Sequence, residues 1–429
     1  MENRNRLSKY LSPIGVWALS FGCSVGWGAF VMPGSTFLPI AGPVGTALGI
    51  AIGAIIMLII GRNYYFLMTR YPDAGGTYTY AKKTLGFDHG FLSAWFLVLT
   101  YIVIVWANLT ALALIGRYLL GDMFCFGFHY QIAGYDIYFG EIFSAIGVLM
   151  LCSLVCIFRK RLAVWVQILM AIILIGGIVL VFIFAMIKNG GQSVTQPAFS
   201  ELVQSNRFMQ VAHIIALTPW AYVGFESVSH SAKEFRFKRK KTFGIIIISV
   251  FTAGLAYILL SLLAVTALPE GYDSWTAYIG DLGSMSGLTG LPTFFAADSA
   301  MGKTGVIILG VAVVGGIITG IIGNMIAATR VLYAISKDDI LPRWFSKTNK
   351  DGNPTHAIMF VTAISAVIPF FGRTAISWIV DVTTVGGTII YCYTSAAAFK
   401  KPALSPTESS RSSPARPAFW CRLRLRCIS

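Results

Sequence analysis

The segment FGCSVGWGAFVMPG, from Phe21 to Gly34, interrupts a hydrophobic stretch that is otherwise long enough to cross a membrane. Glycine weakens a helix and proline lacks the backbone N–H that a helix interior uses, so this segment predicts a broken helix. A second segment, LTPWAYVGFESVSHSAKEF, places Pro219, Gly224 and Glu226 inside a later hydrophobic stretch. Because unpaired backbone groups are costly in lipid, the two breaks predict a protein-lined or water-filled site at mid-membrane.

The composition indicates a polytopic membrane protein. The 429 residues are 56% hydrophobic and 12% charged, and their mean hydropathy is +0.72, which is too apolar for a soluble fold. Apolar runs of helical length recur, whereas the strands of a membrane barrel would appear as short alternating segments. We therefore expect an all-α fold with about ten spans, at residues 13–41, 43–69, 91–119, 139–158, 162–187, 209–232, 243–268, 305–335, 356–372 and 374–398.

The basic residues set the expected orientation. A net charge of +15 would suit nucleic acid, but 28 of the 33 Lys and Arg fall on one side of the membrane if the N-terminus is cytoplasmic. This is the distribution of the positive-inside rule. We expect a multi-pass protein of the cytoplasmic membrane, with both termini in the cytoplasm and no nucleic-acid partner. The seven cysteines follow no disulfide or metal-site spacing, and we expect neither a metal nor a cofactor.

The order of the breaks predicts an internal repeat. They fall in the first and sixth of ten spans, and because five is odd, the second half enters the membrane inverted. We expect a cytoplasmic N-terminus at 1–12 and a transport core at 13–398, with repeats at 13–187 and 209–398. Residues 399–429, rich in Ser, Pro and Arg, predict a disordered basic tail; translation out of frame, or a truncated gene, explains this composition equally well.

The two breaks have complementary chemistry. The half-helix that begins near Gly26 and Gly28 offers free N–H groups and a positive dipole end, which suits a carboxylate. The half-helix that ends near Ala221 to Val223 offers free carbonyls and a negative dipole end, which suits an ammonium group. Together they predict a site for a zwitterion, and an α-amino acid is the commonest small one. The alternative is that these glycines serve only close helix packing.

Five motifs in the same order resemble the amino acid-polyamine-organocation (APC) superfamily, including its arginine/agmatine antiporter-like bacterial members. Asp339 stands where that superfamily usually has glycine. The resemblance covers roughly residues 10 to 398 and rests on these segments: the G-x-x-x-G-x-G-x-F-x-x-P pattern of Gly22, Gly26, Gly28, Phe30 and Pro33; PDAGGTYTYAKKTLG from Pro72; WAYVGFES from Trp220; TRVLYAISKDDILPRWFSKTNKDGNP from Thr329; and DVTTVGGT from Asp381.

The resemblance implies a five-plus-five inverted-repeat (LeuT-like) core with discontinuous helices 1 and 6, and alternating-access transport of an amino acid or related amine. Superfamily members usually have twelve spans, so the last two are missing here. The implied substrate-binding residues are Gly26, Trp27, Gly28, Asn108, Trp220, Ala221, Val223 and Gly224. Glu226 and Trp220 are implied in gating or coupling, and the residues that break the helices are Gly22, Gly26, Gly28, Pro219 and Gly224.

Three features leave the mechanism open at this stage. Glu226 is either a protonation site that couples transport to protons or a fixed acceptor that braces the unwound backbone. Trp27 replaces a small residue, commonly Ser, between the two glycines. With Trp220 and Trp106 it favours a neutral and bulky substrate. The region VQILMAIILIGG lacks the lysine that some sodium-independent members carry, so proton symport and amino acid exchange are both consistent with the sequence.

We therefore expect a secondary transporter and not an enzyme, since no nucleophile-base pair, metal-ligand cluster or phosphate-binding loop is present in the sequence. Its expected partners are an amino acid, a coupling proton and the lipid bilayer, and a homodimer is left open. Two alternatives remain on the sequence alone. One is a non-transporting nutrient or germinant receptor built on the same core, and the other is a truncated, non-functional permease.

Overall fold

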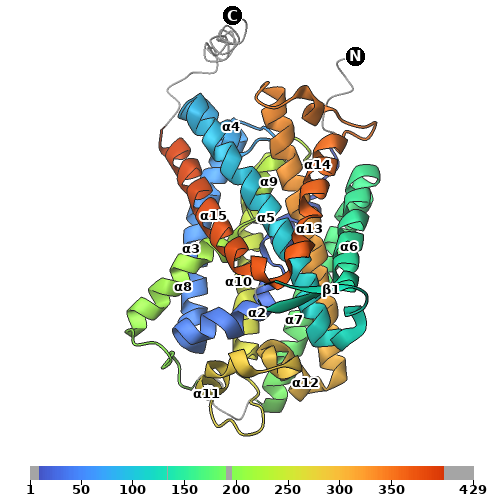
Figure 1. The fold of residues 1–429 in the computed structure, drawn as a ribbon. Coiled ribbons are helices and arrows are strands. Elements are labelled where there is room, and N and C mark those ends of the chain that lie inside the picture. Colours follow the sequence, from blue (N-terminus) through green and yellow to red (C-terminus); the bar gives the residue numbers. More distant parts are fainter. Residues whose placement is uncertain (1–8, 133, 190–195, 401–429) are drawn as a thin grey trace, which may run out of the picture.

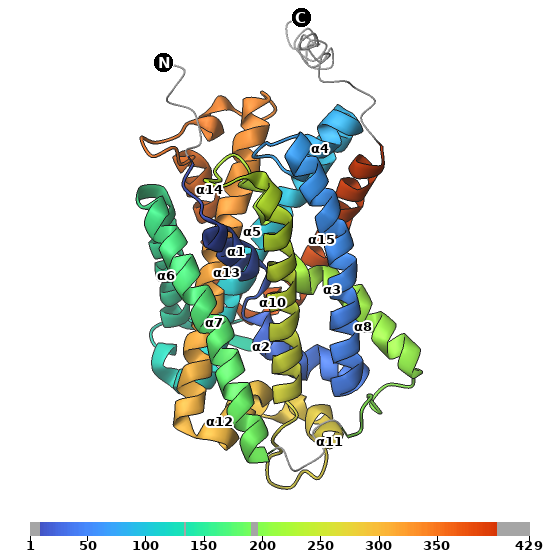
Figure 2. The same ribbon diagram turned by 180° about the vertical axis from the view of Figure 1, so that it is seen from behind.

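The structure, a computed structural model, describes residues 9–132, 134–189 and 196–400, and these form one bundle of helices (Figures 1 and 2). Its first half contains α1 (Pro13–Ser24), α2 (Gly28–Met32), the π-helical turn η2 (Pro33–Phe37), α3 (Leu38–Arg70), α4 (Thr77–Thr84), α5 (Phe87–Leu120), α6 (Phe139–Phe158) and α7 (Lys160–Asn189). Its second half contains α8 (Arg207–Tyr222), α9 (Ser227–His230), α10 (Thr242–Leu263), α11 (Trp275–Gly280), α12 (Pro292–Met301), α13 (Lys303–Lys337), α14 (Thr355–Ser365) and α15 (Ala375–Phe399).

The two ends of the bundle differ in structure. At one end α1 and α5 begin and α13 and α15 end; we call it the basic end, because the described loops and helix ends there carry most of the described lysines and arginines. The opposite end carries α11, α12 and an antiparallel hairpin of β1 (His129–Ile132) and β2 (Tyr135–Tyr138), and we call it the hairpin end. Short 3-10 turns complete the connections: η3 (Gly121–Phe124), η4 (Arg239–Lys241), η5 (Leu282–Ser284), η6 (Gly287–Gly290), η7 (Arg343–Ser346) and η8 (Ile368–Thr374).

Most of the predicted spans coincide with helices. Among the described residues, eight helical segments are long and apolar enough to cross a membrane. One of them, Gly28–Arg70, holds the second half of the first span and all of the second, and it bends at Gly42, whose φ of 66° interrupts the helix. The tenth predicted span corresponds to α15, which has 25 residues. The prediction of an all-α polytopic fold is therefore confirmed.

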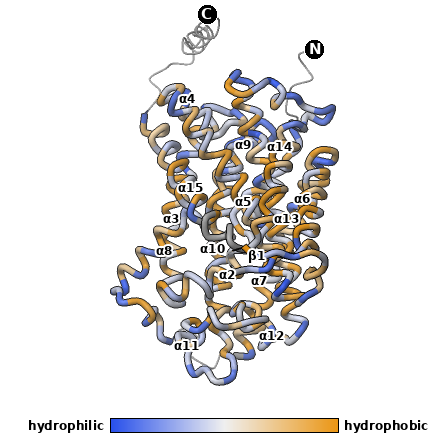
Figure 3. Tube along the Cα trace, in the orientation of Figure 1, coloured by the Kyte–Doolittle hydropathy of each residue, from blue (hydrophilic) through white to orange (hydrophobic). Residues whose placement is uncertain are grey.

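The outer surface of the bundle is apolar in the middle. Large hydrophobic side chains point outward from several helices, and Ile55, Phe143 and Trp165 are 60%, 65% and 69% exposed. Figure 3 shows that hydrophilic residues gather at the two ends, while hydrophobic residues dominate between them. A monomeric soluble protein rarely exposes an apolar surface of this extent, and lipid chains would cover it in a bilayer.

Two local features follow from single residues. The π-helical turn after α2 begins at Pro33, whose carbonyl accepts the N–H of Leu38 five residues on; a proline cannot donate in the preceding turn, and the ladder shifts by one residue. Asp339 has a φ of 58°, a conformation that glycine adopts without strain and that Asp tolerates better than most residues. This explains why glycine is usual at that position.

The predicted tail at 399–429 falls almost entirely outside the described residues, as do residues 1–8 of the predicted N-terminal segment. Within the described part, α1 packs against α7, α10 and α13, and α13 also packs against α5. The broken first span is thus enclosed by helices on several sides. This enclosure is what a break at mid-membrane requires.

Candidate functional site

The first break lies between α1 and α2. Helix α1 ends at Ser24, and Val25 has extended backbone angles of −114° and 102°. Helix α2 then starts at Gly28, and the N–H groups of Ala29 and Phe30 donate to the carbonyls of Gly26 and Trp27. The interruption is therefore confined to residues 25–27, next to the glycines that predicted it.

The second break separates α8 from α9. Helix α8 ends at Tyr222, and residues 223–226 form turns. Gly224 has a φ of 117°, and a Cβ on it would lie 2.6 Å from the backbone carbonyl carbon of Cys23. Only glycine combines this conformation with such a close approach. The second break is therefore in direct contact with the end of α1.

Side chains of α1 tie the two breaks together. The hydroxyl of Ser24 donates to the carbonyl of Tyr222 at 3.0 Å, and that of Ser20 donates to the carbonyl of Phe225 at 3.3 Å. The hydroxyl of Tyr257 on α10 donates to the carbonyl of Ser24 at 3.4 Å. Neighbouring side chains thus form hydrogen bonds with several backbone groups that have no helical partner at the breaks. Lipid could not supply such bonds.

Other released groups stay unpaired. The N–H groups of Gly26, Trp27 and Gly28 donate no hydrogen bond to any described part of the chain. On the opposite side, the carbonyls of Ala221 and Val223 accept none from the described residues, whereas that of Gly224 accepts the N–H of Ser227. Buried backbone groups are nearly always paired, so a ligand or water is the expected partner of these five.

Trp220 covers the first break. A Cβ on Gly28 would lie 2.6 Å from the Cη2 of the Trp220 indole, so the ring rests directly on this glycine. The other face of the break is close to Tyr257, whose ring centroid lies 6.3 Å from that of Trp220 in an edge-on arrangement. Trp220 is only half-buried. The ring therefore covers this glycine in the conformation described.

Asn108 of α5 lies beside Gly26. Its Nδ2 donates to the carbonyl of Ile104 at 2.9 Å, while its Oδ1 is buried and has no partner among the described residues. A Cβ on Gly26 would lie 2.9 Å from that Oδ1. An unpaired buried amide oxygen is costly. It is a ready acceptor for a ligand N–H or O–H at the break.

The two tryptophans near Asn108 and Gly26 are enclosed to different degrees. Trp27 is buried in the main apolar core. Trp106, on α5, is partly buried, and its indole N–H has no acceptor in the described part of the chain.

Two residues predicted to break the helices do not do so. Gly22 lies inside α1, where a Cβ would come within 2.6 Å of the Cβ of Thr319, so it allows α1 to pack closely on α13. Pro219 lies inside α8, and the helix continues to Tyr222. The hydroxyl of Thr218 donates to the carbonyl of Ile215 at 2.7 Å and supplies the bond that the proline cannot make.

Glu226 is buried in the second break and accepts hydrogen bonds from three donors. Its Oε2 accepts the N–H of Gly224 at 2.9 Å and the hydroxyl of Tyr391 at 3.2 Å. Its Oε1 lies 3.0 Å from the hydroxyl of Tyr101, which also contacts His230 at 2.9 Å. Sequence reasoning missed Tyr101, His230 and Tyr391, because these residues come from α5, α9 and α15. Of the three, only His230, four residues after Glu226, is close enough in sequence to have been connected with it.

The crowding at Gly224 gives a testable prediction. Gly224→Ala is expected to lower thermal stability by about 1–3 kcal/mol more than Gly271→Ala, because the added methyl group meets the backbone of Cys23. Gly271 is a matched control, since its φ of 89° is also positive and a Cβ there meets nothing within 4 Å. Thermal unfolding of the two variants in detergent measures the difference. Equal midpoints would show that the contact between the breaks contributes nothing.

The family comparison decides the class of the chain. A model of the family described as amino acid permease matches residues 11–420. This chain belongs to the amino acid permease family. The match and the broken first and sixth spans together confirm the predicted APC-type fold.

Named relatives of the permease are transporters. It is 23% identical over 365 residues to the branched-chain amino acid permease BcaP of Lactococcus lactis subsp. cremoris (strain MG1363), an alignment that covers 82% of the permease and 74% of the relative. It is 24% identical over 364 residues to the methylthioribose transporter of Bacillus subtilis (strain 168), covering 84% and 74%. It is 23% identical over 415 residues to the arginine/ornithine antiporter of Latilactobacillus sakei, covering 92% and 79%.

A solved structure supports the fold of the permease. A Na⁺-coupled sialic acid symporter, described in a substrate-bound outward-open state, is similar with a TM-score of 0.61 and 13% sequence identity. The similarity covers 93% of the permease and 81% of the symporter. At this identity the likeness concerns the fold alone.

A buried ion pair lies at the basic end of the permease. Arg330 of α13 donates to both carboxylate oxygens of Glu234, at 3.1 and 2.8 Å, and the two side chains are 3% and 1% exposed. The N–H groups of Tyr10 and Leu11 donate to the carbonyl of Glu234. A more exposed ion pair joins Lys233 to Asp73 at 2.7 Å. These contacts hold the segment before α1 against the segment after α9.

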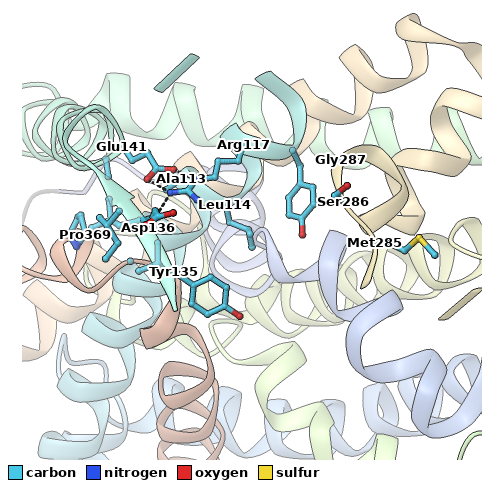
Figure 4. Close-up of a pocket in the computed structure, with 16 residues that line it drawn as sticks. Ala113, Leu114, Arg117, Tyr135, Asp136, Glu141, Met285, Ser286, Gly287 and Pro369 are labelled. Atoms are coloured by element: carbon cyan, nitrogen blue, oxygen red, sulfur yellow. Dashed lines mark hydrogen bonds and ion pairs between the residues drawn. The ribbon is translucent and has the colours of Figure 1, made fainter. Parts of the chain in front are cut away.

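A cavity of about 320 Å³ lies near the hairpin end of the permease, between α5, β2, α6 and η6. Figure 4 shows Arg117 on its wall, directed toward Glu141 and Asp136, with Tyr135 and Ser286 on other sides. Arg117 pairs with the carboxylate of Glu141 and donates to the carbonyl of Asp136. None of the residues predicted to bind substrate lines this cavity, but Leu109 and Thr110 in its lining directly follow Asn108 on α5.

Proposed function

We propose that the permease carries a neutral amino acid across the cytoplasmic membrane by alternating access, as a proton symporter or an amino acid exchanger. The observation that carries this proposal is the pair of facing breaks with unpaired N–H groups at residues 26–28 and unpaired carbonyls at Ala221 and Val223. An α-carboxylate and an α-ammonium group satisfy these two sets at once. The class of substrate agrees with the family to which the chain belongs.

In this proposal the backbone at Gly26, Trp27 and Gly28 binds the carboxylate, and the backbone from Ala221 to Gly224 binds the amine. Asn108 adds one side-chain acceptor beside Gly26. The side chains of Trp27, Asn108 and Trp220 carry no charge. A charged substrate side chain would therefore lack a counter-ion among these three, which favours a neutral amino acid.

Trp220 has the role of a gate in this proposal. Its indole rests on Gly28 and must turn aside before a carboxylate reaches that N–H group. In this proposal a bound substrate replaces the Trp220 ring at Gly28, and the ring then closes over the substrate. The halves at 13–187 and 209–398 would then move relative to each other, with the basic end on the cytoplasmic side and opening as the Arg330–Glu234 contact separates.

Uptake into proteoliposomes tests the proposed function. The purified permease is reconstituted, preloaded with unlabelled amino acid mixtures, and supplied with labelled amino acids one at a time. We expect accumulation of at least one neutral amino acid, competed by its unlabelled form and absent from protein-free vesicles. Binding without flux would favour a receptor instead, and neither binding nor flux for any amino acid or amine would refute the proposal.

Trp27 is the expected determinant of substrate size. The indole of Trp27 is buried, and Trp27→Ser places a small hydroxyl residue between the two glycines. We expect this variant to shift the order of preferred substrates toward larger side chains, with a smaller effect on transport of the best one. Competition of a panel of amino acids against a labelled substrate measures the order. An unchanged order would remove Trp27 from the substrate pocket.

A further inference from the structure

Three buried side chains from three segments form a continuous hydrogen-bonded chain that the substrate site does not use. The hydroxyl of Tyr101 on α5 lies 3.0 Å from Oε1 of Glu226 and 2.9 Å from Nε2 of His230. Glu226 is 1% exposed, and Tyr101 and His230 are fully buried. Each bond is of ordinary length, so the positions of their hydrogens can be worked out from the partners of each atom.

His230 has a fixed hydrogen on one nitrogen. Its Nδ1 lies 3.1 Å from the carbonyl oxygen of Ala74, and a carbonyl only accepts, so Nδ1 must carry hydrogen. A neutral ring then has a lone pair on Nε2, which faces Tyr101. Gly76 makes room for the ring, because a Cβ there would overlap it. The neutral ring can therefore only accept from Tyr101.

Glu226 is equally restricted. Its Oε2 is occupied by two donors, the N–H of Gly224 and the hydroxyl of Tyr391. A proton on this carboxyl group therefore belongs on Oε1, which faces Tyr101. An ionised carboxylate can only accept there. Tyr101 has one hydroxyl hydrogen, so it cannot donate to an ionised Glu226 and to a neutral His230 at the same time.

The bonds of Tyr101 to Glu226 and to His230 form together only when these three side chains hold one additional proton. If Glu226 is protonated, it donates to the oxygen of Tyr101, which donates to Nε2 of His230. If His230 is protonated, its Nε2–H donates to the oxygen of Tyr101, which donates to Glu226. The two arrangements differ by moving one hydrogen along each bond, and no other atom has to move.

We propose that Glu226, Tyr101 and His230 hold the proton that is coupled to transport, and that the Tyr101 hydroxyl passes it between the carboxyl group and the imidazole. In one direction Glu226 gives its proton to the oxygen of Tyr101, and the hydroxyl hydrogen of Tyr101 moves to Nε2. The carboxylic acid becomes a carboxylate and the imidazole becomes an imidazolium, so charge is conserved. This proposal rests on the proposed transport function and names its coupling ion.

The surroundings fit a mobile proton. Tyr64 of α3, Tyr391 of α15 and Cys23 of α1 are the other titratable groups near Glu226, and all are neutral in their ordinary protonated form. No described Lys or Arg pairs with Glu226. On the His230 side, Tyr80 of α4 is near Ser229. A fixed cation would hold Glu226 ionised, and none of these groups supplies one.

The two ends of the hydrogen-bonded chain, Glu226 and His230, lie in different parts of the protein. Glu226 binds the backbone of Gly224 in the second break, beside the carbonyls proposed to hold the amine. His230 binds the carbonyl of Ala74, next to Asp73, whose ion pair with Lys233 lies at the more exposed basic end. Movement of α9 away from Ala74 would separate the chain from this end. Proton position and substrate position are thereby linked through one short segment.

Proton uptake and amino acid counterflow, measured side by side on the reconstituted full chain, test the proposal. A pH-sensitive dye inside the vesicles reports protons, and exchange of labelled for unlabelled amino acid at equal pH reports substrate movement alone. We expect Tyr101→Phe and His230→Gln to lose substrate-dependent proton uptake and stimulation by a pH gradient, while counterflow continues. Tyr278→Phe is the matched control, since it also removes a hydroxyl that donates to a protein acceptor, the carbonyl of Thr289, far from Glu226 in sequence and element.

The outcomes are distinct. Absence of counterflow in the unaltered protein for every amino acid refutes the proposed function. Counterflow without proton uptake in the unaltered protein overturns the proton proposal and leaves the transport function standing. Full proton coupling in Tyr101→Phe or in His230→Gln also overturns it. If either variant does not fold, the ratio of protons to amino acids carried by the unaltered permease decides. The proposal predicts one proton for each amino acid, and a ratio of zero contradicts it.

Discussion

Gly28→Leu is expected to lower the affinity for amino acids by at least about 100-fold while the protein still folds. The new side chain enters the space of the Trp220 ring, whose Cη2 would lie 2.6 Å from even the first added carbon. It also shields the N–H groups proposed to bind the carboxylate. Two hydrogen bonds to a charged group contribute about 1.5–3 kcal/mol each, and every ~1.4 kcal/mol changes affinity tenfold.

Gly176→Leu is the matched control for this variant. Gly176 lies in α7, and a Cβ there meets nothing within 4 Å. The same substitution at this exposed position is expected to leave binding unchanged. Equilibrium binding of labelled substrate, with gel filtration to confirm folding, compares the two proteins. If Gly28→Leu binds as tightly as the unaltered permease, the carboxylate is held elsewhere.

Arg330→Met is expected to cause the largest loss of stability among the charged residues, about 3–5 kcal/mol, because it leaves the carboxylate of Glu234 buried without its partner. Methionine keeps most of the length and apolar volume of the arginine stem, so the effect reports the lost charge and hydrogen bonds. The two side chains are 3% and 1% exposed, and water therefore cannot replace the missing guanidinium. Thermal unfolding in detergent measures the loss.

Two further variants separate charge from packing at this pair. Arg343→Met removes a similar bond to Asp339, but these side chains are 83% and 63% exposed, and its unfolding midpoint is expected to stay unchanged. The double variant Arg330→Met with Glu234→Met is expected to recover much of the stability lost by the single one, since no unpaired charge remains. A double variant less stable than Arg330→Met would contradict this account.

The sequence was sufficient to predict most of the fold, because long apolar runs and the placement of Lys and Arg depend on local composition. The helix α6 coincides with its predicted span at both ends, and the bend at Gly42 falls between the first two predicted spans. The π-helical turn at Pro33–Phe37 was not predicted. It depends on how one proline shifts the hydrogen-bond ladder within an enclosed helix.

The positions of the helix breaks were predicted in part. Glycines that interrupt a hydrophobic stretch can be recognised from the local sequence. They correctly predicted the helix breaks at residues 25–27 and 223–226. The same signal was wrong for Gly22, whose close neighbour is Thr319 of another helix. Tyr101 and Tyr391 could not be connected to Glu226 from sequence, because their partners are far apart along the chain and only packing brings them together.

The position of a bound amino acid tests the central claim most directly. A structure of the permease determined with its transported substrate should show the carboxylate at the N–H groups of residues 26–28, the ammonium group at the carbonyls of Ala221 and Val223, and Trp220 turned from its place on Gly28. A substrate found instead beside Arg117 in the cavity near the hairpin end, with both breaks unoccupied, would contradict it.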